Sequence, residues 1–300
     1  METLKILVVS QKGGVGKSTL STNFVAWYGE KKKQSSVLLD FDPHASSSTW
    51  IKELSPRNVN FKEVSSSDFS AQRWFMGART IIRKVNGTYN VAVADVTWTS
   101  GMNSDFLKEF DLVIVPTSVS QLDIDATQNF IQQNISSFQK KNSSFANKRL
   151  PPSLMLLPSM VTNEQLKTNP FTNKNFNFPF LLLPPIPYDT NVRSLFKNEF
   201  VHQSKLHTKH LFEICFEAIS QAGKVKLKEK TTKLTKKTSL QKIERIQGNP
   251  SFSTNQVKKI WATKTNVHDN QNIARIIKSE EKNTKSFIRK KSWLEKITSW

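Results

Sequence analysis

The turn that decides the fold reads Gln11-Lys12-Gly13-Gly14-Val15-Gly16-Lys17-Ser18-Thr19. It follows the apolar run Leu4–Val9, and apolar residues at helical spacing begin where it ends, over Thr19–Tyr28. A glycine-rich turn between a strand and a helix points backbone N–H groups at one place beside the helix N-terminus, because no Cβ atom blocks a ligand. We interpret the turn as a phosphate-binding loop, and the alternative is a glycine-rich turn that holds no nucleotide.

Two side chains of this loop have a defined place in phosphate chemistry. The Lys17 ammonium can reach the β- and γ-phosphates of ATP, and the Ser18 hydroxyl can be a ligand of Mg²⁺. The ordinary pattern has Gly six residues before that lysine, where this chain has Gln11. The sequence predicts ATP and Mg²⁺ as cofactors. The residues predicted to bind the nucleotide are Gly13, Gly14, Val15, Gly16, Lys17, Ser18 and Thr19.

Strand-like and helix-like segments alternate over residues 1–222. Further apolar runs predict strands at Val37–Phe41, Val91–Ala94, Leu112–Pro116, Leu154–Leu157 and Phe178–Leu183. Helical spacing predicts helices at Ile124–Phe138 and Lys209–Ala222. Such alternation is typical of βαβ units, so we expect an α/β domain with a doubly wound, mostly parallel sheet covered on both faces.

Positive charge is concentrated near the C-terminal end. The chain has 44 Lys and Arg and 24 Asp and Glu, a formal net charge of +20. Residues 223–300 hold 20 Lys and Arg and 6 Asp and Glu, a net of +14, and lack the earlier apolar runs. We predict a folded domain over 1–222 and a basic tail over 223–300 that is partly disordered or helical. Such an excess favours a polyanion as partner, either nucleic acid or an anionic membrane surface.

Several classes of protein are excluded by composition. The single cysteine, Cys215, cannot build a disulfide framework or a thiolate zinc cluster. No run approaches 18 apolar residues, so no membrane-spanning helix is predicted. The first apolar run is too short for the core of a signal peptide, and we therefore expect a cytoplasmic protein.

The run Lys12–Thr19 resembles the deviant Walker A motif of the ParA/MinD ATPases. In that family an additional lysine, Lys12 here, reaches across a sandwich dimer to the nucleotide of the partner subunit. The resemblance implies a homodimer that ATP closes, in which Lys12 supplies a catalytic cation as an arginine finger does. A solvated loop lysine is the alternative. The resemblance covers about residues 3–222 and does not extend to the tail.

Two later strand ends carry aspartates in the order that this family has them. Val37–Pro43 ends in Asp-x-Asp-Pro, and the resemblance implies that Asp42 orients the attacking water and Asp40 supports the magnesium shell. Helix capping is the alternative for this pair. Tyr89–Asp95 is an apolar strand that ends in Asp, the Walker B pattern, so Asp95 would hold Mg²⁺ through water. One or two prolines usually follow this Asp in the family, whereas this chain continues with Val96-Thr97-Trp98.

The segments Phe110–Pro116, Gln121–Ala126 and Leu183–Leu195 resemble one branch of the family, the short plasmid partition ATPases and the VirC-type ATPases of T-DNA transfer. This implies a dimerising ATPase that binds DNA nonspecifically and acts in plasmid or chromosome partition or in DNA-transfer complex assembly. We expect it at the nucleoid or on a plasmid. It also implies a partner that stimulates hydrolysis, a centromere-binding or relaxosome protein. The alternatives are a MinD-like positioning ATPase on a membrane surface and a nucleotide-switched DNA-binding scaffold with little hydrolysis.

Two basic segments are candidates for the partner surface. Cations that would contact DNA phosphates lie at Arg193, Lys197, Lys205 and Lys209. His202, His207 and His210 lie in the same stretch. We interpret them as part of a basic surface strip, and a metal site is the less favoured alternative. A solvated helix face is the alternative for the strip. In the tail, Phe287–Trp300 has an apolar face at helical spacing that would dock on a protein, on nucleic acid or on a membrane, in that order of preference.

Overall fold

The computed structural model describes residues 2–64, 74–139, 150–162, 164–165 and 178–244, with side chains placed as far as Thr232. Strands in these residues form one sheet of order β3-β2-β4-β1-β5-β6-β7, and every neighbouring pair is parallel. The strands are β1 (Leu4–Ser10), β2 (Ser36–Asp40), β3 (Val59–Glu63), β4 (Val91–Thr97), β5 (Leu112–Thr117), β6 (Ser153–Pro158) and β7 (Leu181–Leu182). The predicted doubly wound parallel sheet is confirmed.

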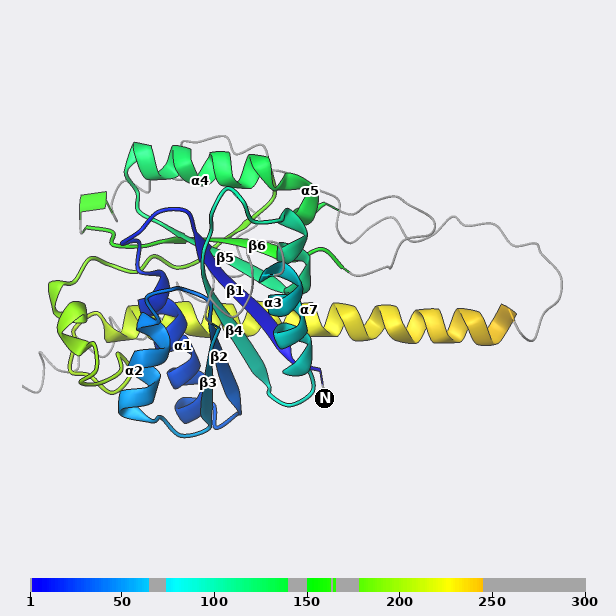
Figure 1. Ribbon diagram of the computed structural model, residues 1–300, viewed down its shortest axis with the longest axis horizontal. Coiled ribbons are helices and arrows are strands. Elements are labelled where there is room, and N and C mark those ends of the chain that lie inside the picture. Colours follow the sequence, from blue (N-terminus) through cyan, green and yellow to red (C-terminus); the bar gives the residue numbers. More distant parts are fainter. Residues whose placement is uncertain (1, 65–73, 140–149, 163, 166–177, 245–300) are drawn as a thin grey trace, which may run out of the picture. The chain divides into compact units, whose positions relative to one another are not determined.

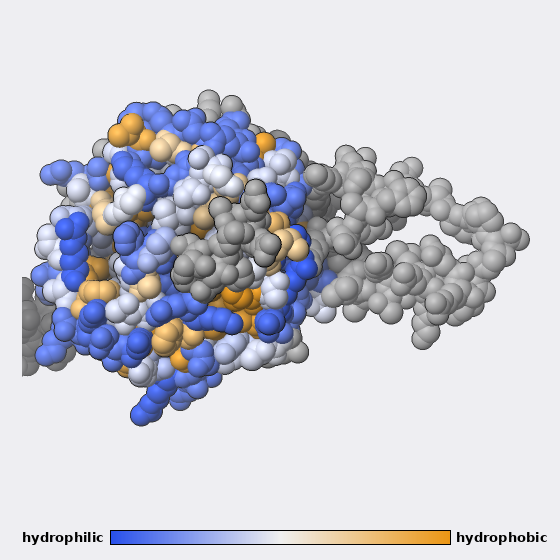
Figure 2. Space-filling view, in the orientation of Figure 1, coloured by the Kyte–Doolittle hydropathy of each residue, from blue (hydrophilic) through white to orange (hydrophobic). Residues whose placement is uncertain are grey.

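Helices cover both faces of this sheet (Figure 1). Phe24 of α1 and Phe216 of α7 belong to the core on one face, whereas Ile82 of α3 and Phe130 of α4 belong to the core on the other. With their apolar side chains in these two cores, the domain presents a mainly hydrophilic surface in the view of Figure 2. The helical elements are α1 (Lys17–Lys31), α2 (Ser46–Leu54), α3 (Trp74–Lys84), η2 (Ser104–Glu109), α4 (Gln121–Gln133), α5 (Ile135–Phe138), η3 (Thr190–Leu195) and α7 (Lys209–Glu244).

Some elements differ from the sequence prediction. Strand β3 lies at the edge of the sheet with four of its five side chains exposed, so it has no apolar run to reveal it. The strand predicted at Phe178–Leu183 shortens to Leu181–Leu182, because Pro179 and Pro184 flank it and a proline has no N–H for the ladder. Helices α2 and α3 were also not predicted. Each buries only a few side chains, so neither has a long apolar stripe.

Helix α7 runs through position 223, where the sequence predicts a boundary. Gly223 lies so close to Leu4 that an added Cβ would come within 2.2 Å of the Leu4 side chain. The Lys226 ammonium is buried and donates to the Pro151 carbonyl at 2.8 Å, and Lys230 Nζ lies 2.8 Å from the Glu2 carboxylate. The first turns of the predicted tail are therefore helical and packed on the domain. The chain divides into two compact units between residues 248 and 249, and the second unit lies outside the described residues.

The strand order brings the sequence motifs together. Strand β4 lies between β1 and β2, with Asp40 opposite Asp95 and Ser10 opposite Thr97. Because the strands are parallel, their carboxyl ends meet at one edge of the sheet, where ligands of open α/β sheets bind. The phosphate-binding loop after β1 and both aspartate motifs therefore converge on one place.

Candidate functional site

The phosphate-binding loop has the backbone conformation that its glycines permit. Gly14 and Gly16 have φ angles of +78° and +83°, in the left-handed region that side chains with a Cβ disfavour. Gly16 is the N-cap of α1 and offers no side chain to the first amides of the helix. The Ser159 hydroxyl, just after β6, donates to the Val15 carbonyl at 2.8 Å and holds the loop from the neighbouring strand. The loop thus presents backbone donors at a helix N-terminus, which suits an anion.

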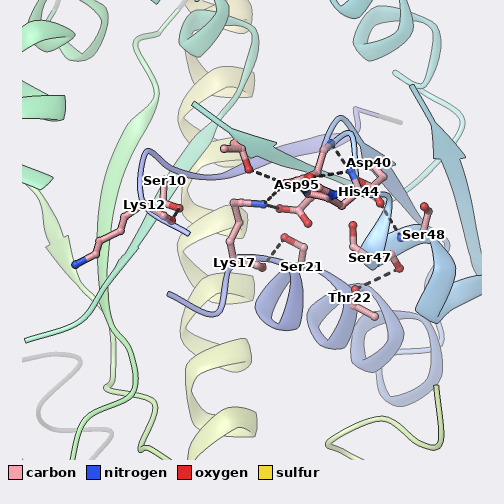
Figure 3. A network of polar contacts seen from close by, with 12 residues as sticks. Ser10, Lys12, Lys17, Ser21, Thr22, Asp40, His44, Ser47, Ser48 and Asp95 are labelled. Carbon is pink, nitrogen blue, oxygen red and sulfur yellow. Dashed lines mark hydrogen bonds and ion pairs between the residues drawn. The ribbon is translucent and has the colours of Figure 1, made fainter. Parts of the chain in front are cut away.

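Lys17 contacts Asp95 of β4 and Asp42, which lies in the bend after β2 (Figure 3). Its Nζ is 2.9 Å from Asp95 Oδ1 and 3.1 Å from Asp42 Oδ2, and the side chain is only 8% exposed. Burial lowers the pKa of Lys17, but the charges of Asp95 and Asp42 outweigh burial and hold that pKa above its ordinary value. The lysine is therefore protonated, and the carboxylates of Asp42 and Asp95 balance its charge.

Asp95 has the buried oxygen that a magnesium site would use. Its side chain is fully buried, which raises the pKa of the carboxyl, while Lys17 and the nearby Ser18 act in the opposite direction. Among the described residues, Asp95 Oδ2 has no hydrogen-bond partner. A buried carboxylate oxygen without a donor is costly, and a cation or its bound water would satisfy it. Asp95 with the adjacent Ser18 hydroxyl therefore fits Mg²⁺.

Asp42 is held as an ionised carboxylate that faces Lys17. Its Oδ2 accepts from Thr97 Oγ1 at 2.6 Å, and its Oδ1 accepts from the His44 backbone N–H at 3.0 Å. Partial burial raises the pKa of Asp42, but these hydrogen bonds and the charge of Lys17 hold it below the ordinary value. Asp42, the residue predicted to orient water, is thus a charged hydrogen-bond acceptor beside the loop.

Asp40 has different contacts, although it belongs to the same motif. Its Oδ1 accepts from the Asp42 backbone N–H at 3.0 Å and its Oδ2 from the Ser48 backbone N–H at 2.8 Å (Figure 3). Ser48 lies in the first turn of α2, so Asp40 fixes the turn from β2 into this helix, as in capping. Its predicted role in the magnesium shell stays a prediction.

Lys12 is directed away from Lys17 (Figure 3). Its ammonium forms an ion pair with Asp123 in the first turn of α4, and the Ser118 hydroxyl donates to the same carboxylate. The Lys12 side chain is 46% exposed. The structure therefore places this lysine at the edge of the site and separates it from the Lys17 cluster.

A cavity of about 1350 Å³ opens at the loop. It is larger than the roughly 300–1000 Å³ of ordinary ligand pockets, so a nucleotide fits within it. Apolar side chains such as Trp74 and Met102 line it together with the loop and with Asp42. Tyr188 and Arg193 also line it, from the segment after β7.

The family follows from the sequence that carries this site. Residues 6–200 match the family model of the CobQ/CobB/MinD/ParA nucleotide binding domain, and these residues span more than half of the chain. The chain belongs to this family. The predicted resemblance to ParA/MinD ATPases is confirmed at this level.

Solved structures share the family fold. A variant McdA from Cyanothece in complex with ATP has 12% sequence identity and a TM-score of 0.57, covering 74% of this chain and 97% of that one. A putative plasmid partition protein from Borrelia burgdorferi bound to AMPPNP has 17% sequence identity and a TM-score of 0.51, covering 73% of this chain and 98% of that one. MinD from Pyrococcus horikoshii with Mg-ADP has 12% sequence identity and a TM-score of 0.53, covering 75% of this chain and 98% of that one. No curated protein matches in a sequence search.

The predicted basic strip is only partly at the surface. Arg193, Lys197 and Lys205 are exposed, whereas Lys209 is half-buried and its Nζ donates to the Ser204 carbonyl at 3.3 Å. His202 does not belong to the strip, contrary to our interpretation. It is buried, because its ring stacks on Phe200 and its Nε2 lies 2.6 Å from the Glu30 carboxylate of α1.

Two further predictions concern membranes and the tail. In the part of the chain that the structure describes, no helix is both long and apolar enough to cross a membrane. The amphipathic segment Phe287–Trp300 lies outside the described residues. Its predicted docking stays a prediction.

Among the contacts of the site that sequence reasoning missed, two hold predicted site residues. Thr97 holds Asp42, and Asp123 holds Lys12. The only signal for Thr97 was that the chain departs from the family pattern after Asp95. No local pattern marked Asp123 as the partner of a residue 111 positions earlier.

Proposed function

We propose that this chain is a magnesium-dependent ATPase that dimerises when ATP is bound, binds DNA without sequence preference, and acts in partition of plasmids or chromosomes or in DNA-transfer complex assembly. The observation that carries the proposal is the buried Lys17 ammonium, held by Asp42 and Asp95 at the rim of a phosphate-binding loop. These groups come from three motifs predicted separately from sequence.

The residues at the loop divide the work of phosphoryl transfer. The backbone amides before α1 would bind the phosphates, and Lys17 would exchange its aspartate partners for the β- and γ-phosphate oxygens. Ser18 and Asp95 would hold Mg²⁺, which when bound neutralises charge on the phosphates. Once Lys17 has turned from Asp42 to the phosphates, the ionised Asp42 carboxylate would be free to accept a hydrogen bond from the attacking water.

The DNA part of the proposal rests on charge. The chain carries +20, and Arg193, Lys197 and Lys205 are exposed cations on the folded domain. Contacts of such cations with phosphates release counterions, which gives binding without sequence preference. The shared fold with a putative plasmid partition protein supports the same class of role.

Phosphate release and co-sedimentation test the proposal with the full-length chain. We expect Mg-ATP turnover, and retention on DNA of arbitrary sequence that rises with ATP. Flotation with anionic liposomes and no DNA retention would favour the MinD-like alternative. DNA binding that responds to ATP without phosphate release would favour the scaffold.

Lys12→Ala should separate nucleotide binding from dimerisation. We expect ATP affinity within about threefold of the wild type, because Lys12 points away from Lys17, and loss of the dimer formed with a non-hydrolysable ATP analogue. Sedimentation velocity measures the dimer fraction, and Lys52→Ala on the exposed face of α2 is the matched control. An unchanged dimer fraction would show that Lys12 does not act on the nucleotide of the partner subunit.

Truncation after Glu244 should weaken DNA binding at low salt. It removes 12 Lys and Arg and 4 Asp and Glu, a net of +8, and retains the whole of α7. Since each phosphate contact releases counterion, the slope of log affinity against log salt should flatten. We expect the full chain to bind DNA with or without ATP at low salt, and the truncated chain to bind only with ATP.

Fluorescence anisotropy with a labelled duplex across a salt series measures both quantities. The cut is placed after α7 because removal of residues 223–244 would also break the packing of Gly223 on Leu4 and the contacts of Lys226 and Lys230. Retained ATP affinity is the control for folding. An identical salt slope in both chains would show that the tail serves another partner.

A further inference from the structure

Three donors from different segments hold the Asp42 carboxylate. Thr97 Oγ1 donates to Oδ2 at 2.6 Å and Lys17 Nζ lies 3.1 Å from the same oxygen, while the His44 backbone N–H donates to Oδ1 at 3.0 Å. Each carboxylate oxygen thus has a donor that does not depend on Lys17. This matters because Lys17 is the one donor that a phosphate would draw away.

The sheet fixes the backbone that carries the Thr97 hydroxyl. Thr97 is the last residue of β4 and lies opposite Ser10 of β1. The next residue, Trp98, is buried, and its backbone N–H donates to the Ser10 carbonyl at 2.9 Å. The Trp98 ring meets Phe130 of α4 edge-on, with centroids 5.5 Å apart. Strand pairing on one side and core packing on the other therefore hold the backbone at Thr97, and the branched side chain has few χ1 rotamers in which to place its hydroxyl.

We propose that Thr97 is a positioning residue, which keeps the Asp42 carboxylate oriented after Lys17 has turned to the nucleotide. The inference rests on the proposed function, in which Asp42 orients the attacking water. With Lys17 withdrawn, Thr97 and the His44 amide hold one oxygen each, so the plane of the carboxylate stays fixed. A catalytic acceptor held in this way needs no reorganisation when water arrives.

Thr97→Val tests this because valine keeps the branched shape and removes the donor. The variant should lower kcat about 10- to 100-fold, the effect expected for a lost hydrogen bond to a charged group, with KM for ATP within about threefold. Thr97→Ser restores the hydroxyl and should recover kcat to within about threefold of the wild type. Thr88→Val, the same substitution at the exposed turn before β4, is the matched control.

A second readout does not use turnover. Crystal structures of the wild type and Thr97→Val with a non-hydrolysable ATP analogue, which draws Lys17 to the phosphates, should show the Asp42 carboxylate turned away from the His44 amide in the variant only. An unmoved carboxylate with unchanged kcat would overturn the proposal, as would a Thr97→Ser chain as slow as Thr97→Val. A wild type without ATPase activity contradicts the proposed function instead, and the crystal comparison then still decides whether Thr97 holds Asp42.

Discussion

Lys17→Ala is expected to weaken ATP binding by about 100-fold or more. The substitution removes the only lysine that the structure places within the cluster of Asp42 and Asp95 in the described part of the chain. A hydrogen bond to a charged group contributes about 1.5–3 kcal/mol, and Lys17 would make such bonds to two phosphates. Isothermal titration calorimetry with ATP measures the change directly.

The control for this experiment is a measurement that Lys17→Ala is still folded. Removal of Lys17 leaves the fully buried Asp95 without its cation, and breaking a buried pair costs about 3–5 kcal/mol. Thermal melts therefore accompany the titration, and Lys52→Ala on the exposed face of α2 is the matched variant. Wild-type affinity in a folded Lys17→Ala chain would show that the loop does not bind phosphate.

Asp42→Ala should slow ATP hydrolysis strongly without weakening ATP binding. Phosphate binding survives because Lys17 and the loop are intact, but the acceptor for the attacking water is gone. Loss of such a group typically costs about 10²- to 10⁴-fold in rate. We expect phosphate release to fall in this range and the ATP-bound dimer to accumulate, measured by single-turnover kinetics and size-exclusion chromatography.

Two variants sharpen the interpretation of Asp42. Asp42→Asn retains an oxygen that accepts from Thr97 but removes the charge, so slow turnover in both variants identifies the carboxylate itself as the requirement. Glu53→Ala, an exposed carboxylate of α2, is the matched control. Turnover at the wild-type rate in Asp42→Ala would exclude this residue as the one that orients water.

The parts predictable from sequence are those written in local patterns. The apolar strands around the loop, the glycines with positive φ and the Asp that ends an apolar run are each visible in a few consecutive residues. The parallel sheet then follows from alternation of strand and helix. The convergence of Lys17, Asp42 and Asp95 follows from this topology, because parallel strands end at one edge.

The remaining features depend on contacts between distant residues. Asp40 and Asp42 share one short motif, but Asp40 accepts from the backbone N–H groups of Asp42 and Ser48, whereas Asp42 faces Lys17. Lys226 and Lys230 read as tail lysines, yet Pro151, Glu2 and Asp111 hold them on the domain. Such pairings depend on the folded arrangement, and no composition or periodicity encodes them.

The continuity of α7 has a mechanical consequence. Helix α7 is one continuous helix (Figure 1). Phe212 in its first turn lines the cavity at the loop, and Lys230 further along the helix is held by Glu2 and Asp111. At 1.5 Å per residue these two points lie about 27 Å apart on one stiff rod. A displacement of α7 at Phe212 would therefore be transmitted along the helix to the contacts of Lys230 with Glu2 and Asp111.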